Sequence, residues 1–193
     1  GCLIKISFFM IRLLRLCIPL IGLLRRVGIQ GPSKCHCCFE PEKEEVNHVF
    51  CIGELVQVVW NTFQCSSGKP VVSSFRHMVI RWWLQQGQNT YIKFVYRLLQ
   101  ILVCWELWKA RNRAVFYEKN MGCTEMVDWI RQQLQVLFHC HSPGIPWSFG
   151  SWDAFHSAVS GRRRRVSILP MSWMAPVAGF KLNSDGCARG NPG

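Results

Sequence analysis

The chain has 193 residues, of which 49% are hydrophobic, and it contains nine tryptophans. This content allows a packed core and excludes a disordered tail, and the length allows one or two small domains. The 23 Lys and Arg residues against 11 Asp and Glu residues give a formal net charge of +12. That charge favours an anionic partner such as nucleic acid or a phospholipid surface, although a basic solvated surface would give the same balance.

The first predicted element is a helix over residues 4–18. Its apolar side chains fall on one broad face, with Arg12 and Arg15 at the rim, and comprise Ile4, Phe8, Ile11, Leu14 and Leu16. Pro19 ends or kinks it. The two arginines keep the apolar run below the ~18 uncharged residues of a membrane span, and no small-residue cleavage site follows convincingly. We therefore expect a buried amphipathic segment and no membrane association; the alternative, a small membrane-anchored protein, rests on this segment alone.

The next predicted helices follow in chain order and are joined by glycine- and proline-containing breaks. A short helix passes through Leu23 and Leu24 to Gly28, and longer helices are expected over about 53–63, 71–86, 90–118 and 123–140. In the helix over 53–63, Leu55, Val58, Val59 and Phe63 are expected to face inward. A second apolar stripe, in the helix over 90–118, is expected to be core and consists of Phe94, Leu98, Ile101, Leu102, Trp105, Trp108 and Phe116.

The last quarter of the chain, from residue 142, differs in composition from the rest. Residues 142–176 contain several Pro and Gly residues and the run Arg162 to Arg165, which predicts a basic linker. The segment over 177–185 alternates as a β-strand would, and it leads into a glycine-rich turn. The predicted fold class is therefore mainly α, with a helical domain that holds a CCHC knuckle, then the linker, then one orphan strand.

A cysteine- and histidine-rich stretch, "CHCCFEPEKEEVNHVFC", predicts a metal site. Cys35 and Cys38 form C-x2-C, His48 and Cys51 form H-x2-C, and nine residues separate the pairs. If His48 and Cys51 open a helix, their i, i+3 spacing places both on one face. Four N and S donors then close a tetrahedral structural zinc site, which supplies folding energy and leaves no open position for zinc catalysis.

Other interpretations of this stretch remain open. Cys37 could replace a neighbouring ligand, although C-x-C spacing is poorer for one knuckle, and His36 is also adjacent. A set of unliganded thiols beside a surface histidine would give the same sequence pattern. Because the chain has an odd number of scattered cysteines, 11 in all, we expect reduced thiols and a cytoplasmic or nuclear rather than secreted protein.

Three blocks of the sequence together resemble a known family. The stretch from "KISFFMIRLLRLCIPLIGLLRRVG" through "CHCC", "NHVFC" and "VVW" is similar to the zinc-binding region downstream of reverse transcriptase in plant LINE-type, non-LTR retrotransposons. "CWELWKARNRAVF" resembles the helix that commonly follows there. "FKLNSDGCARGNPG" resembles the start of a ribonuclease H type 1 domain. The departures include Ile11 where Trp is usual, Ile21 where an acidic or polar residue is common, and Cys37 where an apolar residue is usual.

The resemblance implies a domain plan and a set of site residues. It implies a reverse transcriptase zinc-binding domain over 1–65, a Trp-rich helical region over 66–141, the linker over 142–176 and the N-terminal part of a truncated α/β ribonuclease H fold over 177–193. The implied zinc ligands are Cys35, Cys38, His48 and Cys51. Asp185 matches the first catalytic carboxylate and a magnesium ligand, and Gly186 and Asn191 match positions near the hybrid substrate.

Ribonuclease H chemistry requires more than Asp185. Two magnesium ions need several carboxylates, and the resemblance places the others beyond Gly193. We therefore expect a retrotransposon-derived fragment with no ribonuclease activity, nucleic acid (RNA or an RNA–DNA hybrid) as partner, and no small-molecule substrate. The alternative is a non-enzymatic, zinc-containing nucleic-acid-binding module.

Overall fold

The protein is described by a computed structural model, which places residues 2–31, 34–38, 43–64, 74–84, 89–145 and 150–162. The elements are α1 (Cys2–Leu14), α2 (Ile21–Arg26), the π-helical turn η1 (His48–Ile52), α3 (Glu54–Gln64), α4 (Phe75–Trp83), α5 (Thr90–Tyr117), α6 (Cys123–His141) and α7 (Trp152–Ser160). Within these ranges the only β pairing is the isolated bridge between Lys34 and Lys43. The mainly helical class is thus confirmed, whereas the strand expected over 177–185 lies outside the described residues.

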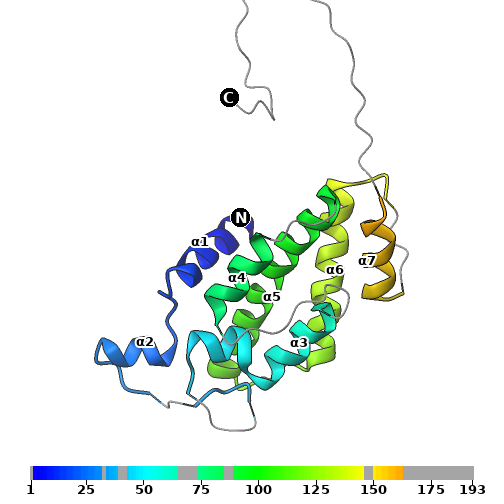
Figure 1. The fold of residues 1–193 in the computed structure, drawn as a ribbon. Helices are drawn as coiled ribbons and strands as arrows, with labels where there is room; N and C mark the ends of the chain where they lie inside the picture. Colours follow the sequence, from blue (N-terminus) through cyan, green and yellow to red (C-terminus); the bar gives the residue numbers. More distant parts are fainter. Residues whose placement is uncertain are drawn as a thin grey trace, which may run out of the picture.

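The long helix α5 is the centre of the fold (Figure 1). It contacts α1, α3, α4, α6, α7 and η1. Because partners cover it on several sides, its buried residues are spread around the helix and include the consecutive Leu102, Val103 and Cys104. The predicted apolar stripe of this helix lies at or next to the core with one exception: Phe116, near the C-terminal end of α5, is 70% exposed.

Helix α7 lies in the range that the sequence predicts to be a linker. Ser151 caps it, its hydroxyl oxygen accepting a hydrogen bond from the backbone N–H of Ala154. Trp152, Phe155 and Val159 are spaced for one helical face, and all three are buried in the core. The Trp152 indole N–H also donates to the backbone oxygen of Phe63, 2.9 Å away. This short apolar face and its cap outweigh the surrounding helix breakers.

Helix α1 buries a face other than the one predicted from the sequence, whereas α3 buries the predicted Leu55, Val59 and Phe63 at or next to the core with Val58 as the exception. In α1 the buried side chains include Phe9 and Leu13, while Ile4 and Phe8 are each 63% exposed. In α3, Val58 is 50% exposed, and the inward residues are Val56, Val59, Trp60 and Phe63. Both segments carry apolar residues on more than one face, so periodicity alone does not select the buried one.

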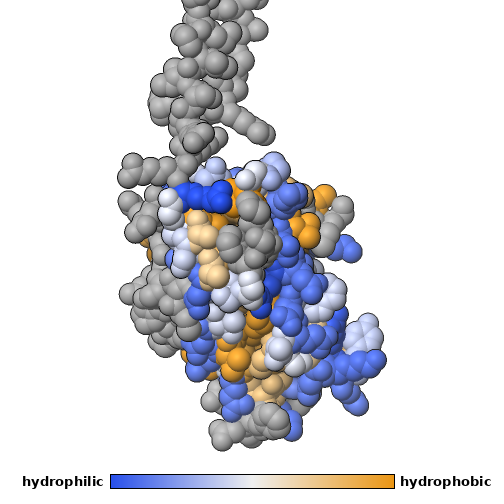
Figure 2. All heavy atoms as spheres, turned by 90° about the vertical axis from the view of Figure 1, so that its right-hand side faces the viewer, coloured by the Kyte–Doolittle hydropathy of each residue, from blue (hydrophilic) through white to orange (hydrophobic). Residues whose placement is uncertain are grey.

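In the described part of the chain, none of the helices is both long and apolar enough to cross a bilayer. On the face shown in Figure 2, hydrophilic residues border a narrow apolar strip.

Asn89 joins the start of α5 to the end of α7. Its side-chain oxygen caps α5 by accepting from the backbone N–H of Ile92 at 2.9 Å. Its amide nitrogen lies 2.7 to 2.9 Å from three backbone oxygens, those of Val159, Ser160 and Arg162. One side chain therefore satisfies groups at two helix ends.

Replacing Asn89 with alanine should lower the free energy of unfolding by about 1–2 kcal/mol, because both the cap and the contacts to the α7 end are lost. Asn89→Ser is the matched control, since serine also caps helices but is too short to reach the α7 carbonyls. Urea unfolding should rank wild type above Asn89→Ser and Asn89→Ser above Asn89→Ala. Equal stability of the serine and alanine variants would contradict a separate role for the cap.

Candidate metal centre

The loop that carries Cys35 and Cys38 is held at both of its ends. The bridge between Lys34 and Lys43 closes it on itself. Immediately after the bridge, Glu44 is buried and pairs with Arg111 of α5, and its carboxylate also accepts from the backbone N–H of Ile21 at the start of α2. The short η1 turn then brings His48 to the loop.

Three of the four sequence-predicted zinc ligands lie together. The Sγ atoms of Cys35 and Cys38 and a ring nitrogen of His48 are all within 4.8 Å of one another. The Cys38 Sγ is 3.2 Å from His48 Nε2. Cys35 and His48 are buried and Cys38 is half-buried. A cavity of ≈ 10 Å³, about the size of one water molecule, is lined by these three residues together with Cys37 and with residues of α3 and α5.

The chemistry of this donor set fits zinc. Two thiols and an imidazole are the ligand types that zinc takes in proteins. Burial raises the pKa of the Cys38 thiol to about 11, and the pKa of Cys35 is raised first by its hydrogen bond with Cys37 and then by burial. Both thiols are therefore protonated at neutral pH in the metal-free chain, and a bound metal would displace those protons.

Cys51 is not among the donors that lie within 4.8 Å of one another. It is fully buried in the hydrophobic core, its Sγ is 4.0 Å from the Met78 sulfur, and burial raises its pKa to about 12. Its expected place beside His48 assumed an α-helix, whereas the two residues lie in a π-turn closed by the bond from the Gly53 N–H to the His48 oxygen. A wider turn rotates less per residue, so side chains three apart diverge. Cys51 as a zinc ligand stays a prediction.

The two alternative ligands are also outside the three-atom group. His36 and Cys37 are both half-buried. The Cys37 N–H donates to the Cys35 sulfur at 3.4 Å, and the hydrogen bond with Cys35 lowers the Cys37 pKa. Cys37 also lines the small cavity beside the three donors, and its place in the metal site stays a prediction.

Sequence reasoning missed the Glu44–Arg111 pair that supports the loop. Arg111 Nη2 and Nε lie 2.5 and 3.2 Å from the two Glu44 carboxylate oxygens, and the guanidinium carbon is 5.4 Å from the centre of the Trp108 ring. Glu44 lies in an acidic stretch of the sequence and Arg111 lies in a helix with several basic residues. Nothing in the sequence therefore distinguished either residue from the solvent-exposed charges around it.

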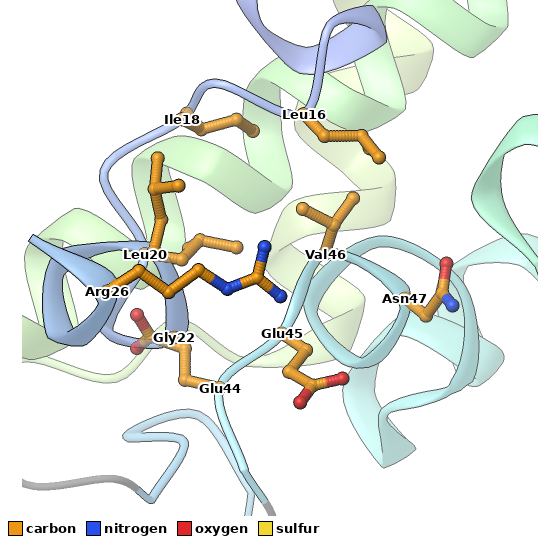
Figure 3. Close-up of a pocket in the computed structure, with 10 residues that line it drawn as sticks. Leu16, Ile18, Leu20, Gly22, Arg26, Glu44, Glu45, Val46 and Asn47 are labelled. Atoms are coloured by element: carbon orange, nitrogen blue, oxygen red, sulfur yellow. The ribbon is translucent and has the colours of Figure 1, made fainter.

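A larger cavity of ≈ 230 Å³ lies between α2 and residues 44–47 (Figure 3). Arg26 extends toward Val46 and Glu45 in this cavity. The nearby Glu44 carboxylate is already used by Arg111 and by the Ile21 N–H, and the Asn47 side-chain oxygen accepts from the backbone N–H of Phe75. The hydrogen bonds of Glu44 and Asn47 connect segments of the fold, so these two side chains do not indicate a ligand for the cavity.

The remaining predicted site residues, Asp185, Gly186 and Asn191, lie outside the described part of the chain.

Comparison with known proteins supports the metal assignment. The family model described as zinc-binding in reverse transcriptase matches residues 1–60, which include all three clustered donors. No curated protein and no solved structure gave a match. The match covers just under a third of the chain.

Proposed function

We propose that this chain derives from a plant LINE-type retrotransposon protein, and that its helical domain is a zinc-stabilised region that binds nucleic acid. The observation that carries the proposal is the Cys35, Cys38 and His48 cluster, which lies inside the residues that match the reverse transcriptase zinc-binding family. The Trp-rich helix motif and the later "FKLNSDGCARGNPG" also support it. Both resemble the family in sequence, and they follow the zinc-binding segment in the order that the family has. In this proposal the zinc supports the fold, and the basic residues supply contact with RNA or an RNA–DNA hybrid.

The charge of the chain supports a nucleic-acid partner. Exposed basic side chains occur on several of the described elements and include Arg12, Arg25, Arg76, Arg113 and Lys119. The run Arg162 to Arg165 adds four consecutive cations just after α7. Such cations neutralise backbone phosphates and release counterions, which is a sequence-independent and salt-dependent mode of binding.

The proposal extends to residues 177–193 as the opening of a ribonuclease H type 1 domain. Its support is the sequence alone, with Asp185 as one carboxylate of a magnesium site and Gly186 and Asn191 near the substrate. A non-enzymatic nucleic-acid-binding module is the competing function. Magnesium-dependent cleavage of a hybrid that is lost in Asp185→Asn would decide against the module.

Binding of the chain to single-stranded RNA should weaken steeply as salt increases. Changing Arg162 to Arg165 all to glutamine should lower the slope of log K against log salt by up to about 3, since each phosphate contact on a single strand contributes ~0.7. Fluorescence anisotropy across a salt series measures this slope.

A variant with four scattered changes, at Arg12, Arg76, Arg113 and Lys119, is the matched control because it loses the same charge. A slope change confined to the run places the contact there, and equal changes in both variants indicate a general surface charge effect. No binding at low salt would contradict the nucleic-acid part of the proposal.

A further inference from the structure

We propose that a single-stranded nucleic acid binds where the end of α4 meets the first turns of α5, with an unpaired base stacked on the Trp83 ring and phosphates on Lys93, Arg97 and Arg162. These four residues are called the Trp83 surface below. The inference rests on the nucleic-acid binding proposed above, and it gives that binding a place and a preference for unpaired bases. Two observations carry it: an exposed indole ring beside a cation, and a row of cations that leads from this ring to the arginine run.

Trp83 is the last residue of α4, which packs beside α5 (Figure 1). It is 48% exposed, and its neighbours Ile80 and Leu84 are exposed as well. The Arg97 guanidinium carbon lies 6.0 Å from the centre of the Trp83 ring. Exposed apolar residues that stand singly are ordinary, but an accessible indole next to a guanidinium is the arrangement on which nucleic-acid bases stack.

The cations follow one face of α5 away from this ring. Asn89, Lys93 and Arg97 are spaced four residues apart, which places them on the same side of the helix over about 12 Å. Arg97 is exposed and Lys93 is half-buried. The Asn89 amide nitrogen lies 2.8 Å from the backbone oxygen of Arg162, so the arginine run begins at the start of α5. The row therefore leads from the Trp83 ring through Lys93 to Arg162.

The sequence around this row has no acidic residue. Residues 55–105, which include α4 and the first half of α5, contain no Asp or Glu. The Lys and Arg residues of this range are Lys69, Arg76, Arg81, Lys93 and Arg97. On α7, Asp153 lies in the first turn, at the opposite end of the helix from Arg162. A phosphate backbone along the row is therefore attracted to it, and no carboxylate of residues 55–105 opposes this attraction.

The indole and the cations should act on different parts of the ligand. In a duplex the bases are stacked on one another and paired, so the Trp83 ring gains a partner only from an unpaired base. Lys93, Arg97 and Arg162 attract phosphates of either form. Because stacking releases no counterions, loss of the ring should change the affinity without changing its salt dependence, whereas loss of a cation should change both.

Fluorescence anisotropy of the zinc-loaded full chain, with a short labelled RNA strand and with its duplex, tests this assignment. Trp83→Ala should weaken binding of the single strand by roughly 5- to 150-fold and leave the salt slope unchanged. Duplex affinity should not change in this variant. Arg97→Gln should lower the slope of log K against log salt for the single strand by about 0.7. If Trp83→Ala does not fold, Trp83→Phe and Trp83→Leu replace it, and only the phenylalanine variant should keep most of the affinity.

Trp129→Ala is the matched control for the ring, because Trp129 is 49% exposed but lies on α6 next to Asp128. Arg113→Gln is the control for the charge, since Arg113 is an exposed arginine at the other end of α5. Trp129→Ala should keep the wild-type affinity. Arg113→Gln should keep the wild-type salt slope.

Equal losses in Trp83→Ala and Trp129→Ala would overturn the inference, and so would a loss in Trp83→Ala that is the same for the duplex. Binding to phosphatidylserine vesicles that Trp83→Ala removes, with RNA affinity unchanged, would overturn it in favour of a membrane surface. A wild-type chain that binds neither RNA form at low salt would instead refute the nucleic-acid function itself, so the two failures are distinguishable.

Discussion

Replacing Arg111 with methionine is expected to lower the free energy of unfolding by about 3–5 kcal/mol, because it leaves a buried carboxylate without its counter-ion. Glu44 is only 1% exposed, and both of its oxygens contact the Arg111 guanidinium. The Glu44 carboxylate also accepts from the Ile21 N–H at 3.1 Å, but this is a single neutral donor. Guanidinium chloride unfolding of the zinc-loaded protein measures the change.

Arg113→Met provides the matched control for the Arg111 variant, since Arg113 is an exposed arginine on the same helix. It should change the stability by less than about 0.5 kcal/mol. Adding Glu44→Met to Arg111→Met should recover much of the loss, because no unpaired charge is then buried. If Arg111→Met cost no more than Arg113→Met, the pair would have no structural role.

Removing zinc is the second change with a large expected effect. If free zinc is held at ~1,000 times its Kd, withdrawing it should lower the stability of the folded chain by about 4 kcal/mol. Purified chain should contain one zinc, and Cys35→Ser should lose both the metal and the stabilisation. Zinc uptake should also release protons, so affinity should fall as the pH is lowered.

Thermal unfolding with and without a chelator measures this stabilisation, and elemental analysis gives the zinc content. Cys17→Ser is the control, because Cys17 is an exposed thiol outside the centre, and it should respond to the chelator as the wild type does. A chain without zinc, or one whose unfolding midpoint ignores the chelator, would show that the cluster is only a set of neighbouring thiols.

Much of the helical plan was predictable because it depends on local signals. The helices expected over 90–118 and 123–140 occur at Thr90–Tyr117 and Cys123–His141, where long apolar periodicity begins after Asn89 and after Gly122. The pairing of Cys35 with Cys38 was predictable because C-x2-C spacing folds two thiols to one side, whereas His48 joins them from a π-turn and not from the expected α-helical turn.

Other features were not predictable because they depend on contacts distant in the sequence or on small changes in helix geometry. Glu44 and Arg111 are 67 residues apart, and only the fold pairs them. The π-turn that separates Cys51 from His48 differs from an α-turn by one residue in its hydrogen bond, a change that has no clear sequence signature. Which face of α1 is buried was decided by α5, against which α1 packs.

The contacts of α5 bear on how this chain can be dissected. Residues 1–60, which match the family model, include the three clustered donors and, in α1, η1 and most of α3, three of the six elements that contact α5. In the folded chain, no surface of the Phe50, Val59 and Trp60 side chains is exposed. A segment cut after residue 60 would carry the metal ligands but present these side chains to water. A piece that keeps the core closed for metal or nucleic-acid measurements therefore extends through α7, to about residue 162.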